Sequence, residues 1–135
     1  MFIEGYMIDF NLKPYQWKQQ MKLIFENINL VTMNIINNTT MNFQFSNSYN
    51  GELLNSILCK NIWKLSINCD DTIEKEYPIF IGNVSFIKLK GENIKEAFNL
   101  LNYRFNIPES NEYNFLCIDS GEISISLICK SMEII

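Results

Sequence analysis

Carboxylates and tyrosines are the side chains in this sequence that could carry chemistry, because histidine is absent. The 135 residues include 15 Asp and Glu, 11 Lys and Arg and no His. Nucleophiles paired with histidine, histidine proton shuttles and His-ligated metals are therefore excluded. We assign no catalytic residue, and we expect neither a metal nor a cofactor.

The densest acidic segment is Asp70-Asp71-Thr72-Ile73-Glu74-Lys75-Glu76. An EF-hand loop needs oxygen ligands at alternate positions, a glycine at the sixth and a glutamate at the twelfth, and this spacing is absent. We interpret the segment as a solvated loop after a strand. Asp70 and Asp71 are kept as candidate contacts to a basic partner.

Glu4 shares one face of a predicted strand with Tyr6, Ile8 and Phe10. A carboxylate in an apolar cleft could have a raised pKa and act as a general acid. A strand end at which Glu4 reaches solvent explains the same pattern. A small enzyme that uses carboxylate and tyrosine chemistry therefore remains an alternative function.

Tyrosines beside acidic residues in the C-terminal third suggest a contact surface. Exposed tyrosines of this kind are typical interface anchors. The alternative is an ordinary solvated surface. The candidate partner-binding residues of this region are Tyr103, Glu109, Glu112, Tyr113, Asp119 and Glu122.

The charge balance favours a protein partner over nucleic acid. Net charge is −4, the only arginine is Arg104, and the excess of acid lies in residues 101–135. Nucleic-acid binding draws on clustered Lys and Arg, so we expect no nucleic-acid partner. A basic protein partner suits an acidic surface, because opposite fields speed encounter.

The cysteines and the N-terminus predict a reduced, cytoplasmic protein. Cys59, Cys69, Cys117 and Cys129 have no C-x-x-C spacing, and free cysteine packs like a small hydrophobe. Residues 1–10 lack the basic region of a signal peptide, and no apolar run approaches the ~20 residues of a membrane helix. We therefore expect no membrane association.

The first half of the chain predicts a strand at 2–10, a helix at 14–27, a hairpin and a short helix at 50–60. The helix at 14–27 rests on the helical spacing of Trp17, Met21, Ile24, Phe25 and Ile28. In the hairpin, strands 29–36 and 40–46 are joined by the three-residue loop 37–39. This loop pairs Ile35 with Met41, Met33 with Phe43 and Val31 with Phe45.

The second half predicts more strands and one more helix. Alternation from Trp63 to Cys69 indicates a strand, and residues 79–90 hold one long strand or two short ones. A helix after Gly91 has the buried stripe Ile94, Ala97, Phe98 and Leu101. The last hairpin turns at Ser120-Gly121, and it places Cys117 and Cys129 on opposite faces, where they cannot form a disulfide.

These elements predict one α+β domain over residues 1–135. Their order is β-α-ββ-α-β-β-α-ββ, which gives a largely antiparallel sheet with two main helices and one short helix packed on one face. The abundance of Asn, Ile and Lys is typical of a low-GC bacterial genome.

In size, acidity and lack of catalytic residues the chain resembles the small immunity proteins of bacterial toxin systems. Its closing hairpin, Leu116-Cys117-Ile118-Asp119-Ser120-Gly121-Glu122-Ile123, belongs to the same resemblance. The resemblance implies a non-enzymatic protein-binding module that inhibits a basic toxin. A homo-oligomeric structural or ligand-binding protein is the remaining alternative.

Overall fold

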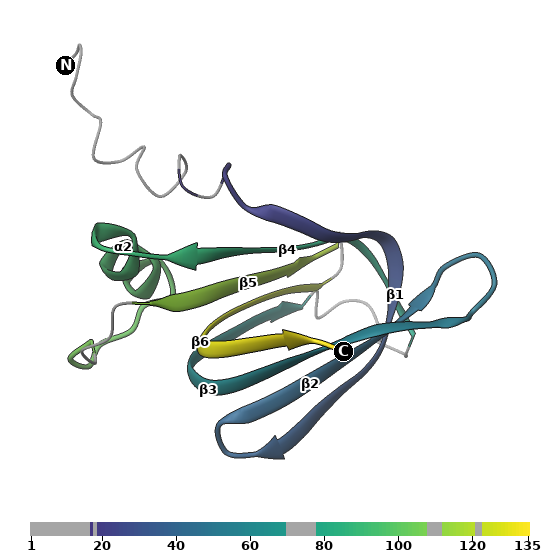
Figure 1. The fold of residues 1–135 in the computed structure, drawn as a ribbon, viewed down its shortest axis with the longest axis horizontal. Coiled ribbons are helices and arrows are strands. Elements are labelled where there is room, and N and C mark those ends of the chain that lie inside the picture. Colours follow the sequence, from purple (N-terminus) through teal and green to yellow (C-terminus); the bar gives the residue numbers. More distant parts are fainter. Residues whose placement is uncertain (1–16, 18, 70–77, 108–111, 121–122) are drawn as a thin grey trace, which may run out of the picture.

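The described residues fold into a closed, antiparallel β-barrel with helix α2 on its outer surface (Figure 1). The computed structural model describes residue 17 and residues 19–69, 78–107, 112–120 and 123–135. The predicted strand at 2–10 lies outside the described residues. The strands of the barrel are β1 (Lys22–Asn37), β2 (Thr40–Asn47), β3 (Leu53–Cys69), β4 (Ile79–Leu89), β5 (Tyr113–Asp119) and β6 (Ile123–Ile134).

Around the barrel the strand order is β1-β2-β3-β6-β5-β4, and β4 pairs back with β1. Every one of these pairings is antiparallel. Because the barrel is closed, none of these strands forms an exposed sheet edge where it is paired. The backbone N–H and C=O groups there form hydrogen bonds with neighbouring strands.

The predicted α+β class is wrong, because strands replace a large part of two of the three expected helices. Residues 22–27 of the expected helix at 14–27 belong to β1, and residues 53–60 of the expected helix at 50–60 belong to β3. The third expected helix is confirmed as α2 (Glu92–Leu100), with Ile94, Ala97, Phe98 and Leu101 on its buried side.

Register shifts inside the two mispredicted segments explain this error: one lies between Leu23 and Phe25 in β1, and the other lies between Leu53 and Ser56 in β3, opposite Gln44 and Ser46. Asn27 in β1 and Asn61 in β3 have left-handed backbone angles, with φ of 53° and 55°. Register shifts lie close to both residues, between Leu23 and Phe25 and between Ile62 and Lys64. Each extra residue bends a strand and resets which side chains point inward, and long strands need such bends to follow a barrel.

Two apolar layers share the wall of the barrel. The interior is filled by side chains from all six described strands, among them Leu30, Phe43, Ile57, Ile81 and Leu116. The outer layer is formed where α2 and Trp17 pack against β4, β5 and β6. Its buried members are Trp17, Leu89, Ile94, Ala97, Phe98, Leu101, Tyr113, Phe115, Cys117 and Ile128.

The first hairpin has the predicted pairs near its tip but a shorter turn, and Ile35 of the first pair is 73% exposed, so this pair does not lie in the interior. Ile35 pairs with Met41 and Met33 with Phe43, as predicted. Asn37 pairs with Thr40, so the expected three-residue loop is wrong, and the extra residue is accommodated by a register shift beside Ile36. A second shift pairs Phe45 with Leu30, where Val31 was expected.

The last hairpin keeps its predicted faces although its register differs by two residues. Asp119 pairs with Ser124, whereas a turn at Ser120-Gly121 would pair Asp119 with Glu122. A shift of two residues preserves side-chain orientation. Cys129 therefore faces the interior and Cys117 the outer layer, as predicted.

Within the described residues, the structure contains no helix with the length and apolar character that crossing a bilayer requires.

Candidate functional site

The structure does not bring the predicted contact residues together. Glu109, Glu122, Asp70 and Asp71 lie outside the described residues. Glu112 is exposed just before β5, and Asp119 is exposed at the far end of that strand, about 20 Å from Tyr113 at ~3.4 Å per residue. The described members are thus divided between two ends of β5.

The two tyrosines differ in exposure. Tyr113 is 1% exposed and packs edge-on against Phe98 with ring centroids 5.4 Å apart, so the expectation of an exposed ring is wrong for this residue. Tyr103 is half-buried and keeps part of its ring at the surface. Of the two, only Tyr103 can offer its ring to a partner.

Asp119 serves its own hairpin. Its carboxylate accepts hydrogen bonds from Ser124 Oγ at 2.7 Å and from Cys117 Sγ at 3.3 Å. Both donors belong to the same pair of strands, β5 and β6. These two hydrogen bonds give the Asp119 carboxylate a structural role beside the turn, so its position there does not indicate a bound ligand.

A different surface gathers around Trp63, at the bulge of β3. The register shift between Ile62 and Lys64 leaves Trp63 without a paired residue on β6. Bulges re-aim side chains, and this indole is 42% exposed although it lies in the middle of a long strand. An exposed tryptophan held by a paired strand is a strong candidate for a contact residue.

The tip of the β1–β2 hairpin borders one side of Trp63. The amide and hydroxyl of Thr39 donate to Asn37 Oδ1 at 2.9 and 3.2 Å, which shapes the turn. The carbonyl of Thr39 in turn accepts a hydrogen bond from the Ile62 amide at 3.0 Å. This bond ties the hairpin tip to the bulge that carries Trp63.

The segment after α2 borders the other side, and its backbone is set by a Schellman motif. Asn102 has φ of 58°, Tyr103 N donates to Phe98 O at 3.0 Å, and Asn102 N donates to Asn99 O at 3.0 Å. The rings of Tyr103 and Phe98, with centroids 4.8 Å apart, make the apolar contact that accompanies this motif. Tyr103 is therefore held in place from the core outward.

Phe105 extends the same aromatic series to solvent. Its ring lies edge-on to Tyr103 with centroids 5.7 Å apart, and the side chain is 78% exposed. The rings of Tyr113, Phe98, Tyr103 and Phe105 thus form a continuous series from the outer layer to the surface.

Three shallow hollows meet at Trp63. One of about 410 Å³ lies between Trp63, Lys64 and the segment 102–105. A second, of about 290 Å³, lies between Thr39, the bulge and Lys130, and a third, of about 270 Å³, reaches Ile35 and Leu65. We call the residues that these hollows bring together around the indole the Trp63 surface: Trp63, Lys64, Tyr103, Arg104, Phe105 and Lys130.

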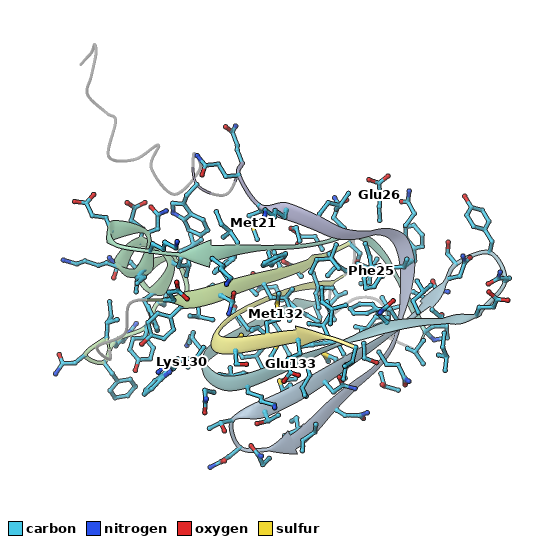
Figure 2. All side chains as sticks on the ribbon, in the orientation of Figure 1. Met21, Phe25, Glu26, Lys130, Met132 and Glu133 are labelled. Atoms are coloured by element: carbon cyan, nitrogen blue, oxygen red, sulfur yellow. The ribbon has the colours of Figure 1, made fainter. Side chains whose placement is uncertain are left out.

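Half of the Trp63 surface is cationic. Lys130 projects from β6 near the bend of β3, while Met132 and Glu133 follow on opposite sides of β6 (Figure 2). Glu133 is paired with Lys60 at 3.0 Å. No Asp or Glu among the described residues lines any of the three hollows.

Sequence reasoning found Tyr103 but missed the rest of this surface. The alternation from Trp63 to Cys69 predicts a strand with Trp63, Leu65 and Ile67 on one face, and such a pattern does not distinguish a buried tryptophan from an exposed one. The available signal was Asn61, because asparagine tolerates the left-handed conformation that a bulge uses.

The thiol groups of the interior offer no reactive site. Hydrogen bonding to Cys129 and burial raise the pKa of the Cys59 thiol far above its ordinary value, so it stays protonated. Among the described residues, no three Cys, Asp or Glu side chains are grouped to hold a metal ion.

Comparison with known proteins identifies relatives of the fold. The crystal structure of an uncharacterized protein from Neisseria gonorrhoeae superimposes with a TM-score of 0.57 and 21% sequence identity, over 84% of this chain and 95% of that one. At this identity the likeness concerns the fold alone. No curated protein matches the sequence.

A protein-family model described as "-like:-like" matches residues 23–135, which include all of the strands named above except the first residue of β1. Because the match spans well over half of the chain, the protein belongs to that family.

Proposed function

We propose that this protein is a non-enzymatic binding module that engages a partner protein through the Trp63 surface. The observation that carries the proposal is a partly exposed tryptophan, placed on a bulge and surrounded by three hollows. Tryptophan, tyrosine and arginine dominate binding energy at protein interfaces, and this surface contains one of each.

The rigidity of the surrounding backbone supports the proposal. Trp63 lies on a strand of a closed barrel, the hairpin tip is bonded to the bulge, and Tyr103 is held by the Schellman motif. A surface ordered before binding loses less conformational freedom on association. Such preorganisation suits an inhibitor that must bind tightly, as a toxin-immunity protein does.

The enzyme alternative draws no support from this surface. General acid-base chemistry without histidine needs carboxylates beside a cleft, and the described lining of the hollows contains none. Glu4, on which that alternative depended, lies outside the described residues.

The test begins with the product of the gene next to this one in its host genome, purified and titrated against this protein by calorimetry. Trp63→Ala should weaken binding at least tenfold, because loss of a central aromatic anchor removes ~2 kcal/mol or more. Phe80→Ala is the matched control, since Phe80 is an exposed aromatic on β4, outside the Trp63 surface, and should change the affinity less than twofold.

Equal losses in the two variants, or an affinity that neither variant changes, would show that the Trp63 surface is not the interface. Failure of the neighbouring protein to bind wild type would count against the immunity-type role. Circular dichroism of each variant confirms that the barrel is intact before affinities are compared.

A further inference from the structure

The charge of the Trp63 surface is opposite to that of the whole chain. Net charge is −4, yet the charged members of this surface are Lys64, Arg104 and Lys130. In the part of the chain that the structure describes, the ion pair formed is Lys60 with Glu133, and these three cations have no carboxylate partner within 4 Å. Among the described residues, no carboxylate therefore competes with a ligand for these three charges.

A hollow with an apolar and a polar side lies beside Trp63, and Lys64 is one of its lining residues. Its apolar lining is Ile35, Met41, Ile62, Trp63 and Leu65, and its polar lining is Asn37, Asn38, Thr39 and Thr40 of the hairpin tip. Its volume of about 270 Å³ is enough for one or two aliphatic side chains. The surface thus combines an apolar anchor position with three surrounding positive charges.

We propose that the occupant of the Trp63 surface is an acidic polypeptide segment of the partner. Its carboxylates pair with Lys64, Arg104 and Lys130, and one of its aliphatic side chains fills the hollow against Trp63. This inference rests on the proposed function, and it names the chemistry of the partner at that same surface. It differs from the basic partner expected from net charge, because the acidic residues behind that expectation are not part of this surface.

Single-stranded nucleic acid is the competing occupant, since cations interleaved with aromatic rings also bind bases. Two observations favour polypeptide. Arg104 is the only arginine and three cations neutralise few phosphates. The apolar part of the hollow beside Trp63 includes Ile35, Ile62 and Leu65, whose aliphatic side chains suit a leucine or isoleucine better than a planar base.

Intrinsic fluorescence provides a direct probe, because the two tryptophans differ in exposure. Trp17 is buried in the outer layer and Trp63 is exposed. In a Trp17→Phe variant, Trp63 is the only tryptophan and can be excited selectively at long wavelength. With each ion's quenching normalised to its quenching of free tryptophan amide, iodide should quench Trp63 more strongly than caesium at low salt because the local potential is positive. Equal normalised quenching, or stronger normalised quenching by caesium, would overturn the assignment of charge.

The probes are three ligands titrated into the Trp17→Phe protein: a peptide alternating Glu and Leu, the same peptide with Lys for Glu, and an oligo-dT of equal length. The Glu-Leu peptide should change the Trp63 emission, with an affinity that falls at least tenfold between 50 and 500 mM salt. The Lys-Leu peptide should bind at least tenfold more weakly. Tighter binding of oligo-dT than of the Glu-Leu peptide would replace our proposal with a nucleic-acid site.

Charge reversal separates local charge from net charge. A triple variant Lys64→Glu, Arg104→Glu and Lys130→Glu should lose at least tenfold in affinity for the Glu-Leu peptide and for the purified partner. The matched control, Lys22→Glu, Lys88→Glu and Lys90→Glu, reverses three lysines on and beside β1 and β4 and so carries the same net charge. It should lose less than threefold, and an equal loss in the two variants would refute local recognition.

The same variants distinguish the failure of this inference from the failure of the proposed function. If Trp63→Ala abolishes partner binding but the triple reversal at the surface does not, the surface is the interface and its ligand is not acidic. If neither change weakens partner binding, both proposals fail.

Discussion

At the residue scale, the four cysteines are separated by burial and by barrel face. Cys59 and Cys129 lie in the interior, Cys117 lies in the outer layer, and Cys69 is exposed at the end of β3. The placement of Cys117 and Cys129 on opposite faces could be predicted from the alternation of side chains along the two strands of the last hairpin. The contact between Cys59 and Cys129 could not, because it depends on the pairing of β3 with β6, which are far apart in sequence.

We expect a single fast thiol in the native protein. Ellman's reagent at neutral pH should label Cys69 within minutes, because thiolate reactivity requires access, while the other three thiols should react only on the timescale of unfolding. A Cys69→Ser variant should lose the fast phase entirely and keep the slow one. A second fast thiol in that variant would contradict the burial of the barrel cysteines.

The raised pKa of Cys59 predicts lower stability in alkali. The unfolded thiol loses its proton near its ordinary pKa of about 9, whereas the folded thiol keeps its proton. The folded state then binds one more proton, so the contribution of Cys59 is complete below pH ~9 and declines above it by ~1.4 kcal/mol per pH unit. Urea unfolding at pH 8 to 10.5 measures this decline.

A Cys59→Ala variant is the test of that assignment. It should be less stable at every pH, because a buried side chain is truncated, but its stability should fall less steeply above pH 9. Cys69→Ala is the control and should follow wild type. Parallel curves for wild type and Cys59→Ala would show that another group causes the decline.

At the element scale, bulges explain both what could be predicted and what could not. Inward residues of β3 include Ile57, Cys59, Ile62 and Leu65, so the two-residue spacing becomes three on passing Asn61, with its left-handed backbone, and again on passing the bulge at Trp63. Spacing of three and four is also the signature of an amphipathic helix. Local pattern could not separate the two, because a bulge is stabilised by neighbouring strands that are distant in sequence.

Where strands lack bulges, the pattern was sufficient. The last hairpin alternates strictly from Tyr113 to Asp119, and its inward and outward faces were predicted correctly. The helix at α2 was found because its apolar stripe is continuous over a full nine residues. The Trp63 surface was not predicted for the same reason that two strand segments were predicted as helices. Trp63 is exposed because of a bulge, and local sequence pattern does not reveal a bulge.

The Schellman motif after α2 should be sensitive to its residue in the left-handed conformation. Asn102→Ala should lower the free energy of unfolding by ~1 kcal/mol, because φ of 58° strains a residue with a Cβ and no local hydrogen bond. Asn102→Gly, which adopts this conformation readily, should retain or raise stability. Thermal unfolding of the two variants measures the difference.

The binding readout gives the same motif a functional test. Because Tyr103 and Phe105 follow Asn102 directly, Asn102→Ala should also weaken partner binding, while Asn102→Gly should not. If the alanine variant is destabilised but binds as wild type does, the motif supports folding and not the Trp63 surface.

At the scale of the whole molecule, β5 joins the two apolar layers into one structure. Leu116 and Ile118 fill the interior while Tyr113, Phe115 and Cys117 belong to the outer layer, so alternate residues of one strand contribute to both. Trp17 packs edge-on against Phe115 with ring centroids 5.2 Å apart. If the barrel unfolds, the outer layer therefore loses the strand β5 against which it packs.

This shared wall predicts that helix layer and barrel unfold together. In a Trp63→Phe variant the only tryptophan is Trp17, so its fluorescence reports the outer layer while far-ultraviolet circular dichroism reports mainly the barrel. The two guanidinium transitions should coincide, as two-state unfolding requires. Leu116→Ala, a change inside the barrel, should lower the free energy of unfolding by ~2–5 kcal/mol and move both transitions equally. Leu53→Ala, at an exposed position, should move neither transition by more than ~0.5 kcal/mol.

A Trp17 transition that precedes the loss of circular dichroism would mean that α2 and Trp17 detach while the barrel is still folded. Since Tyr103 depends on Phe98 in that layer, the Trp63 surface would then be partly dismantled before the fold itself is lost.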